Sequence, residues 1–486
     1  MSKSKENGDD GKKGIRSAAA LLFGLTICQT PHIAFSSGKF TISRFKIPQH
    51  CLGLYINRMI ITFKLWTFVG VMAMTTYDIF CGKIMGEINS TLMFSVLATY
   101  LMMLLTYYTG GNQGHLTLYF WVITTMSLIM GLIFITAVKV MSDNISFLIV
   151  SFPLAGIWVS LYHLLFLFIW RYFRLQNTHY WLVFWQLVIA VSMAGLTLML
   201  WFVGYGFSIQ ESGQHATAGS GEGSNSDIFT ALKQAWHPIL MSGIGYGMQN
   251  LVYPSIAPYK LAGSDGHGIY LTTLFTGSVP PLTLLCLSKI GKGPDVKWSE
   301  NQIWHGCSLC VIVEILCAAL FICGLHYPDW KISQAITGNT CLLWILTILY
   351  DFCVQVANAV GSNGAPVQGK KRNSTMSTVN SSCYSFTQII FSSIGDGYMR
   401  TYQKHENDRE NWPTKHCGNL RAFWFWTWNA TKVSLSEFKT ALTTDLRGAI
   451  QTKKEYLFIV YSDDTDNSSN PPKTKNPTVM KIVHDI

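Results

Sequence analysis

Long apolar runs recur along most of this chain, and no other feature constrains its fold as strongly. A helix needs about 20 mostly apolar residues to cross a bilayer. Of the 486 residues, 49% are hydrophobic and only 13% are charged, whereas soluble domains carry roughly 25% charged residues. Because backbone groups in lipid must be paired within the chain, such runs form helices. The sequence therefore predicts an all-α, polytopic membrane protein embedded in the lipid bilayer.

The apolar runs fall into two sets of five, separated by a Gly/Ser-rich stretch at residues 208–227. Gly/Ser-rich sequence is flexible, so this stretch is expected to be a linker. We expect two helical bundles, residues 65–207 and 228–397, that meet face to face around a central cavity. The expected spans are residues 65–81, 92–108, 116–138, 145–170, 181–207, 231–253, 269–287, 303–325, 340–360 and 379–394.

The N-terminal residues 1–64 are expected to form a cytosolic tail. The first 15 residues are polar and of mixed charge, and residues 39–64 are basic. Both compositions are typical of segments outside the membrane. Between them, residues 18–35 are moderately apolar but contain Gln29 and His32. We expect an interfacial or loop segment there.

At the other end, residues 398–486 are expected to form a polar C-terminal tail. Within it, the aromatic run from Phe423 to Trp428 is too short to span a bilayer. This run could lie on a membrane surface or pack in a small domain, and the sequence leaves both alternatives open. The stretch that follows, residues 434–454, predicts a soluble helix.

Basic residues at span ends indicate orientation, because loops rich in Lys and Arg stay in the cytosol. Arg171, Lys289 and Lys370 each follow an expected span, so each loop is expected to be cytosolic. The linker must then be cytosolic too, although five spans after a cytosolic N-terminus would place it outside. One helix is therefore uncounted or absent in the first half, and residues 18–35 are the candidate for an atypical extra segment. The alternative is a linker on the outside, consistent with its acidic residues Glu211, Glu222 and Asp227.

Polar side chains inside the spans mark candidate solute contacts, because they are costly in lipid. Asp351 lies near the middle of its span, too far from either end to reach water, and we expect its polar face to point into the bundle. Residues three or four positions apart share one face of a helix. At such spacings the spans carry the candidate substrate-binding residues Asp351, Gln355, Asn358, Tyr246, Gln249 and Tyr253, with Glu314 in a neighbouring span.

These stripes have two interpretations. Amides, hydroxyls and tyrosines on facing helices suit a cavity that binds a polar, largely uncharged solute. Alternatively, such residues only hold helices together, as Ser, Asn and Gln do in many membrane proteins. If Asp351 titrates during transport, uptake should depend on pH and Asp351→Asn should abolish that dependence.

The span at 231–253 is interrupted by glycine, and prolines follow it at Pro254 and Pro258. Broken helices often line substrate paths in transporters, although Gly and Pro are also simply common in membrane helices. Small residues let backbones approach closely. We therefore expect Gly243 and Gly247 at the contact between the two bundles.

Enzyme chemistry finds little support in the sequence. No nucleophile elbow, zinc-protease helix or P-loop is present, so we expect no enzyme, no catalytic residues and no cofactor. Cys307 and Cys310 form an isolated C-x-x-C within an apolar run, and a zinc site needs about four ligands. No metal site is expected. The net charge of +10 lies in tails and loops, so no nucleic-acid partner is expected.

Four short motifs resemble equilibrative nucleoside transporters. Residues 251–256, Leu-Val-Tyr-Pro-Ser-Ile, resemble the family's V-F-P-x-[VI] stretch, and Ser362-Asn363-Gly364 resembles its S-N-G motif. Residues 76–80 occupy the place of its P-W-N-x-F motif, and residues 288–292 that of its D-x-x-G-R motif, with Ser288 and Lys292 replacing the terminal residues. Residues 253–260 also resemble the Tpr-related membrane proteins of piroplasm parasites.

The resemblance implies a fold like that of the major facilitator superfamily, with two bundles and about 10–11 transmembrane helices, six then five in the family. It implies a transporter for a nucleoside or nucleobase, working by alternating access, with the plasma membrane as the expected location. The alternatives are a facilitator-type transporter of another family and a non-transporting member of an expanded parasite family with a structural or surface role. The oligomeric state is left open.

Overall fold

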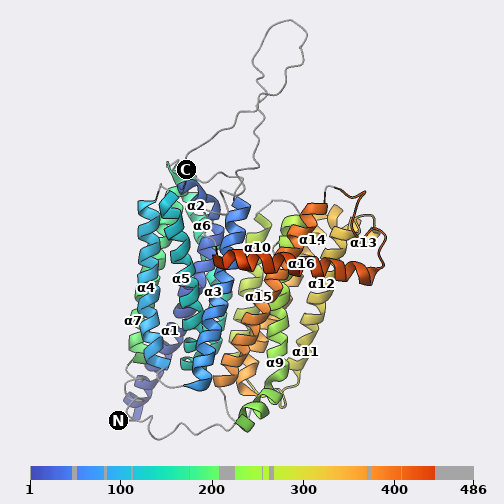
Figure 1. Ribbon diagram of the computed structural model, residues 1–486. Coiled ribbons are helices and arrows are strands. Elements are labelled where there is room, and N and C mark those ends of the chain that lie inside the picture. Colours follow the sequence, from blue (N-terminus) through green and yellow to red (C-terminus); the bar gives the residue numbers. More distant parts are fainter. Residues whose placement is uncertain are drawn as a thin grey trace.

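The computed structural model describes residues 2–45, 52–81, 85–110, 113–173, 176–206, 225–253, 255–261, 267–368, 374–406 and 408–443. All regular structure in these residues is helical, which confirms the all-α class. Figure 1 shows two upright bundles side by side, with one long helix lying across the second. The predicted two-bundle architecture is therefore present.

The first bundle holds six long helices and several short ones. The long helices are α1 (Ser2–Ser36), α3 (Leu52–Phe80), α4 (Met85–Thr109), α5 (Gln113–Val140), α6 (Ile145–Tyr172) and α7 (Thr178–Trp201). The short ones are α2 (Gly38–Arg44), the 3-10 turn η2 (Ser142–Asn144) and the π-helical end η3 (Phe202–Gly206). One continuous hydrophobic core joins them.

The second bundle holds five long upright helices. They are α9 (Asn225–Val252), α10 (His267–Lys289), α12 (Ser308–His326), α14 (Thr340–Gly364) and α15 (Ser374–His405). Shorter elements are η4 (Ser255–Lys260), α11 (Ile303–Gly306), α13 (Lys331–Gly338) and η5 (Ala365–Val367). The crossing helix is α16 (Asn419–Thr443).

Eight of the described helical segments are long and apolar enough to cross a membrane by length and composition. They include all six long helices of the first bundle, α12 with α11, and α14 with η5. The remaining upright helices, α9, α10 and α15, run beside these spans (Figure 1) and complete the second bundle.

Helix α1 corrects the expectation of a 64-residue tail. Residues Lys13–Ala34 form a candidate span, with Phe23 and Ile27 fully buried in the core of the first bundle. Its polar residues find partners there: Thr30 and Tyr100 share a hydrogen bond of 2.6 Å. The sequence suggested an interfacial segment because such residues lower the hydropathy of the run. The uncounted sixth helix of the first half is therefore α1.

The C-terminal tail is also shorter than expected, because helix continues beyond residue 398. Helix α15 extends to His405 and α16 packs on it. Tyr402 and Trp426 are buried in the core of the second bundle. The aromatic run is thus part of a long helix that packs against the bundle and does not form a separate domain.

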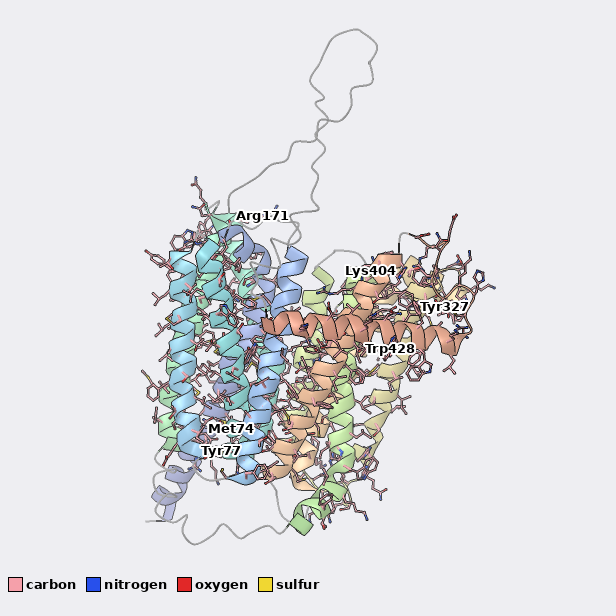
Figure 2. All side chains as sticks on the ribbon, viewed as in Figure 1. Met74, Tyr77, Arg171, Tyr327, Lys404 and Trp428 are labelled. Atoms are coloured by element: carbon pink, nitrogen blue, oxygen red, sulfur yellow. The ribbon has the colours of Figure 1, made fainter. Side chains whose placement is uncertain are left out.

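Orientation along the bundle axis differs from the charge-based scheme. Six helices return the chain to the end at which it began, so the first turns of α1 and α9 lie at the same end of the molecule (Figure 1). Of the linker at 208–227, residues 208–224 lie outside the described residues. Arg171 lies at the opposite end (Figure 2), whereas α10 descends to the linker end. Arg171 and Lys289 therefore cannot both face the cytosol.

The glycines of α9 face helices of their own bundle. A Cβ on Gly243 would meet Thr387 of α15 at 3.8 Å, and one on Gly247 would meet Phe391 of the same helix at 3.0 Å. The expectation that they form the contact between bundles is wrong. Gly247 lets α9 and α15 approach within the second bundle, where this pair has the most extensive packing, whereas a Cβ on Gly243 would make only an ordinary contact.

Candidate functional site

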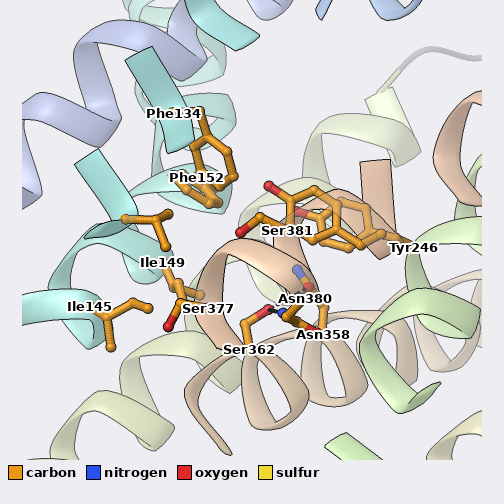
Figure 3. A pocket seen from close by; sticks show the side chains of 12 residues that line it. Phe134, Ile145, Ile149, Phe152, Tyr246, Asn358, Ser362, Ser377, Asn380 and Ser381 are labelled. Carbon is orange, nitrogen blue, oxygen red and sulfur yellow. Dashed lines mark hydrogen bonds between the residues drawn. The ribbon is translucent and has the colours of Figure 1, made fainter. Parts of the chain in front are cut away.

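A small cavity lies where the two bundles meet. Its volume is about 10 Å³, enough for roughly one water molecule. Helices α5 and α6 supply one wall, and α9, α14 and α15 supply the other (Figure 3). The lining residues are Phe134, Val138, Ile145, Ile149, Phe152, Tyr246, Asn358, Ser362, Ser377, Asn380, Ser381 and Tyr384.

The wall from the second bundle is polar and aromatic. The rings of Tyr246 and Tyr384 stack at 4.8 Å with an angle of 21°. Ser242 donates to Asn380 Oδ1 at 2.6 Å, and the Nδ2 of Asn380 donates to Ser362 at 3.4 Å. Ser362 in turn lies 3.3 Å from Asn358 Oδ1. This chain links three helices through hydroxyl and amide groups.

The wall from the first bundle is apolar. Phe134 meets Tyr384 edge to face, with ring centroids 5.9 Å apart, and it packs on Phe152 at 5.3 Å. The cavity is therefore asymmetric: one bundle offers hydrogen-bonding groups and stacked rings, and the other offers an aromatic and aliphatic surface. None of the lining side chains carries a charge.

Of the residues predicted as solute contacts, Tyr246 and Asn358 line the cavity. Asp351 lies inside the second bundle on α14, about two turns before Asn358. It does not line the cavity. Gln249 Nε2 donates to its Oδ1 at 3.1 Å, and Thr276 donates to its Oδ2 at 2.5 Å. Asp351 thus joins α9, α10 and α14.

The other three predicted residues lie apart from the cavity. Gln355 follows Asp351 by one turn on the same face of α14. Tyr253 directly follows α9 and packs against the core of the second bundle. Glu314 is fully buried on α12, and neither carboxylate oxygen has a hydrogen-bond partner. Its neighbours include Asp351 and Cys310.

Polar contacts between the bundles close the interface above and below the cavity. Towards the end that carries α16, Lys64 Nζ of α3 donates to Asn250 Oδ1 at 2.5 Å and to Ser392 Oγ at 2.8 Å. Towards the linker end, Thr75 and Ser382 share a hydrogen bond of 2.7 Å. Hydrogen bonds therefore join the two bundles on both sides of the cavity.

A further contact strengthens the seal at the linker end. Ser146 at the start of α6 donates to Asn363 Oδ1 of α14 at 2.9 Å. Asn363 belongs to the Ser-Asn-Gly motif, and Ser362 of the same motif lines the cavity. This motif thus lies at the meeting point of the two bundles.

Sequence reasoning missed Lys64. It lies one residue before the expected start of its span at residue 65, and therefore falls in the expected tail. A span starting one turn earlier would have included it. The structure shows α3 as a single helix through this position, with the lysine reaching two helices of the other bundle.

The sequence marks Asp78 only as part of the motif at residues 76–80. Its side chain is 2% exposed and forms an ion pair with Lys139 of α5. This pair lies within the first bundle.

In the described part of the chain, no three His, Cys, Asp or Glu side chains are grouped so that they could hold a metal ion.

Comparisons with known proteins give likeness in structure alone. No family model and no curated protein matches this sequence. The solved structures that resemble it include the major facilitator superfamily proton:xylose symporter XylE bound to 6-bromo-6-deoxy-D-glucose. The sequence identity is 10% and the TM-score is 0.48. The match covers 90% of this chain and 97% of that chain. A bacterial homologue of the iron transporter ferroportin is 12% identical over 87% of this chain and 98% of its own, with a TM-score of 0.47.

Proposed function

We propose that this integral membrane protein transports a polar, largely uncharged solute by alternating access. The observation that carries the proposal is the cavity between the bundles, whose two walls come from different bundles. If the bundles rock apart at one end, the polar wall becomes open to that side. Rocking of one bundle against the other around a fixed site is how many transporters work.

The closed contacts at both ends support this reading. The cavity holds about one water molecule, far less than a solute needs, so solute enters only when one end opens. Neutral hydrogen bonds such as Thr75 to Ser382 and Ser146 to Asn363 are suited to breaking and reforming, because each contributes only about 0.5–1.5 kcal/mol net. They can be exchanged for water when an end opens.

The chemistry of the wall favours a nucleoside or nucleobase. A flat heterocycle stacks on an aromatic ring with about 1–3 kcal/mol per base, and Tyr246 and Tyr384 offer such rings. Asn358 and Asn380 supply both donors and acceptors for the base edges. The count of six long helices followed by five upright ones in the described residues is also what the resemblance to nucleoside transporters implies.

Uptake tests this proposal directly. The full chain is expressed in a strain that lacks its own nucleoside and nucleobase uptake, and the plasma-membrane fraction is checked for the protein. We expect saturable uptake of at least one radiolabelled nucleoside or nucleobase above the level of the empty vector. Absence of uptake of any such solute by protein at the membrane would favour the structural or surface role.

Tyr246→Ala separates solute binding from folding. Loss of stacking should raise the KM for uptake roughly 5- to 150-fold, the equivalent of about 1–3 kcal/mol. Tyr108, whose side chain is 59% exposed, provides the matched control, because Tyr108→Ala removes the same group outside the cavity. Equal effects of the two substitutions would contradict the assignment of the site.

A further inference from the structure

Helix α16 lies across the second bundle at the level where several spans end. Figure 1 shows it nearly perpendicular to the upright helices, extending towards α3. Ser434 donates to the Ser393 carbonyl of α15, and Trp426 packs on His326 at 4.8 Å. His326 is the last residue of α12 and of its candidate span. The helix is therefore at one boundary of the membrane-spanning region.

Two faces of α16 differ sharply. Ala422, Trp426, Ala430 and Ser434, spaced by four residues, are buried on the bundle. The opposite face exposes large apolar side chains: Leu420 (73%), Trp424 (61%), Trp428 (71%) and Leu435 (64%). Figure 2 shows Trp428 on the edge of α16 away from Lys404. Trp is enriched where membrane meets water, because one part of its ring is apolar and one part is polar.

Cations accompany this aromatic stripe. Arg421 and Lys432 are exposed on α16 beside it. A shallow groove of about 430 Å³ runs between α15 and α16, and its lining includes Arg400 and Lys404 with Gln403, Val433 and Ser436. Arg400 also pairs with Asp396 at 2.9 Å. Lys and Arg next to an apolar face are typical of helices that lie in the membrane interface.

We propose that α16 is an in-plane interfacial helix and that the groove beside it binds the phosphate of a phospholipid headgroup. Trp424 and Trp428 then lie at the boundary of headgroups and acyl chains, while Lys404 and Arg400 reach the phosphate. Charge-assisted bonds from Arg and Lys to phosphate are the strong kind. A bilayer explains the apolar stripe, the cations and the position at the span ends together, whereas a protein partner would explain only the first.

Photocrosslinking identifies what covers the stripe. The full chain carrying p-benzoylphenylalanine in place of Trp428 is reconstituted in phosphatidylcholine vesicles, irradiated and analysed by mass spectrometry. The replacement is aromatic, so the fold is retained. We expect phospholipid adducts at position 428, several-fold more than with the same probe at Lys415, an exposed position in the loop before α16. A crosslinked dimer, or adducts no more frequent than at Lys415, would overturn the proposal.

Replacing the headgroup tests the groove. Vesicles of phosphatidylcholine are compared with vesicles of digalactosyldiacylglycerol, which has no phosphate. We expect a higher melting temperature in the phospholipid, with the difference reduced by Lys404→Gln and unchanged by Lys233→Gln, an exposed cation on α9. Inorganic phosphate added to the glycolipid vesicles should not restore the difference. A Lys404→Gln variant that keeps the full difference, or restoration by free phosphate, would overturn the headgroup site.

Discussion

Two buried carboxyl groups on neighbouring helices of the second bundle differ in their hydrogen bonding. Asp351 accepts hydrogen bonds from Gln249 and Thr276, whereas both oxygens of the fully buried Glu314 have no partner. A buried polar group without a partner costs about 1–3 kcal/mol, and more if it is charged. Asp351 therefore contributes to the packing of α9, α10 and α14, and Glu314 does not contribute in this way.

Substitution of Asp351 should separate hydrogen bonding from charge. Asp351→Asn keeps a carbonyl acceptor for Gln249, and the Thr276 hydroxyl can accept from the new amide, so the melting temperature in detergent should change little. Asp351→Ala removes the acceptor of the Gln249 amide and leaves Thr276 only the Thr272 carbonyl of its own helix, so it should destabilise the protein by about 1–3 kcal/mol. Transport by Asp351→Asn should lose any dependence on pH seen in the wild type. Equal destabilisation by Asn and Ala would mean that the hydrogen bonds retained by Asn contribute nothing to stability.

Replacing Glu314 with an apolar residue should stabilise the protein, whereas removing the Asp351 carboxyl should destabilise it. Met has a similar volume and no polar atom, and replacing buried ionic groups with packed apolar ones is often stabilising by about 1–4 kcal/mol. Glu314→Met should therefore raise the melting temperature of the purified protein. If transport uses this carboxyl group, uptake should fall in the same variant, as in a trade-off between stability and activity. A lower melting temperature for Glu314→Met would mean that the carboxyl has a structural partner.

At the scale of helices, close backbone approach determines which elements pair. Helices α3 and α5 have among the most extensive packing in the molecule, and Gly70 and Gly131 meet at their crossing. A Cβ on Gly70 would lie 2.5 Å from the Leu128 carbonyl oxygen and 2.9 Å from the Leu132 nitrogen. Backbone atoms cannot move aside as a flexible side chain can. Any larger residue must push the helices apart.

Gly70→Ala should therefore destabilise the first bundle by about 1–3 kcal/mol, the usual cost of overpacking. Gly195 in α7 provides the control, because a Cβ there would meet nothing within 4 Å. Gly195→Ala should be neutral or stabilising by up to about 1 kcal/mol, since alanine favours helix. The two variants are compared by thermal unfolding in the same detergent. Similar melting temperatures for both would contradict the close crossing.

At the scale of the whole molecule, the contact between the bundles is what an alternating-access protein must change. At the α16 end, the charged side chain of Lys64 hydrogen-bonds to both α9 and α15. At the other end the hydrogen bonds of Thr75 and Ser146 join neutral groups, beside a cation–π contact of Lys289 with Phe147 at 5.1 Å. The two ends therefore differ in strength, because hydrogen bonds to charged groups are worth about 1.5–3 kcal/mol.

Lys64→Met should shift the population towards a state open at the α16 end. Spin labels at Tyr172 and Gln403, exposed positions near that end of the two bundles, report their separation by double electron–electron resonance. The distance distribution should gain a longer component in Lys64→Met. Lys64→Arg keeps a cation with several donors, and Lys233→Met removes an exposed one; neither should change it. A distribution unaffected by Lys64→Met would mean that Lys64 does not hold this end closed.

Membrane orientation is a second prediction for the whole molecule. We expect the linker to be cytosolic, with the α16 end outside. In a variant without accessible native cysteines, Ser220→Cys should react with an impermeant maleimide only after the cells are permeabilised. Gln403→Cys, at the α16 end, should react in intact cells. Labelling of Ser220→Cys in intact cells would reverse the orientation.

The sequence by itself determined the class and most of the spans. Apolar runs cannot be exposed to water and cannot leave backbone groups unpaired in lipid, so the membrane helices and the division into two halves followed directly. Helical spacing also indicated that the faces carrying Tyr246 and Asn358 are polar, and both residues line the cavity. These inferences use only local composition and the helical repeat.

Only the tertiary structure decided which polar side chains of different helices become hydrogen-bond partners. Helix α1 and Lys64 look polar in a hydropathy window, and their inclusion in the bundle depends on partners such as Tyr100, Asn250 and Ser392, which lie far away in the sequence. The same holds for Asp351 and Glu314, which look alike in the sequence but differ in their neighbours. Hydropathy measures the cost of burying a group alone, whereas burial is decided by the partner that the fold supplies.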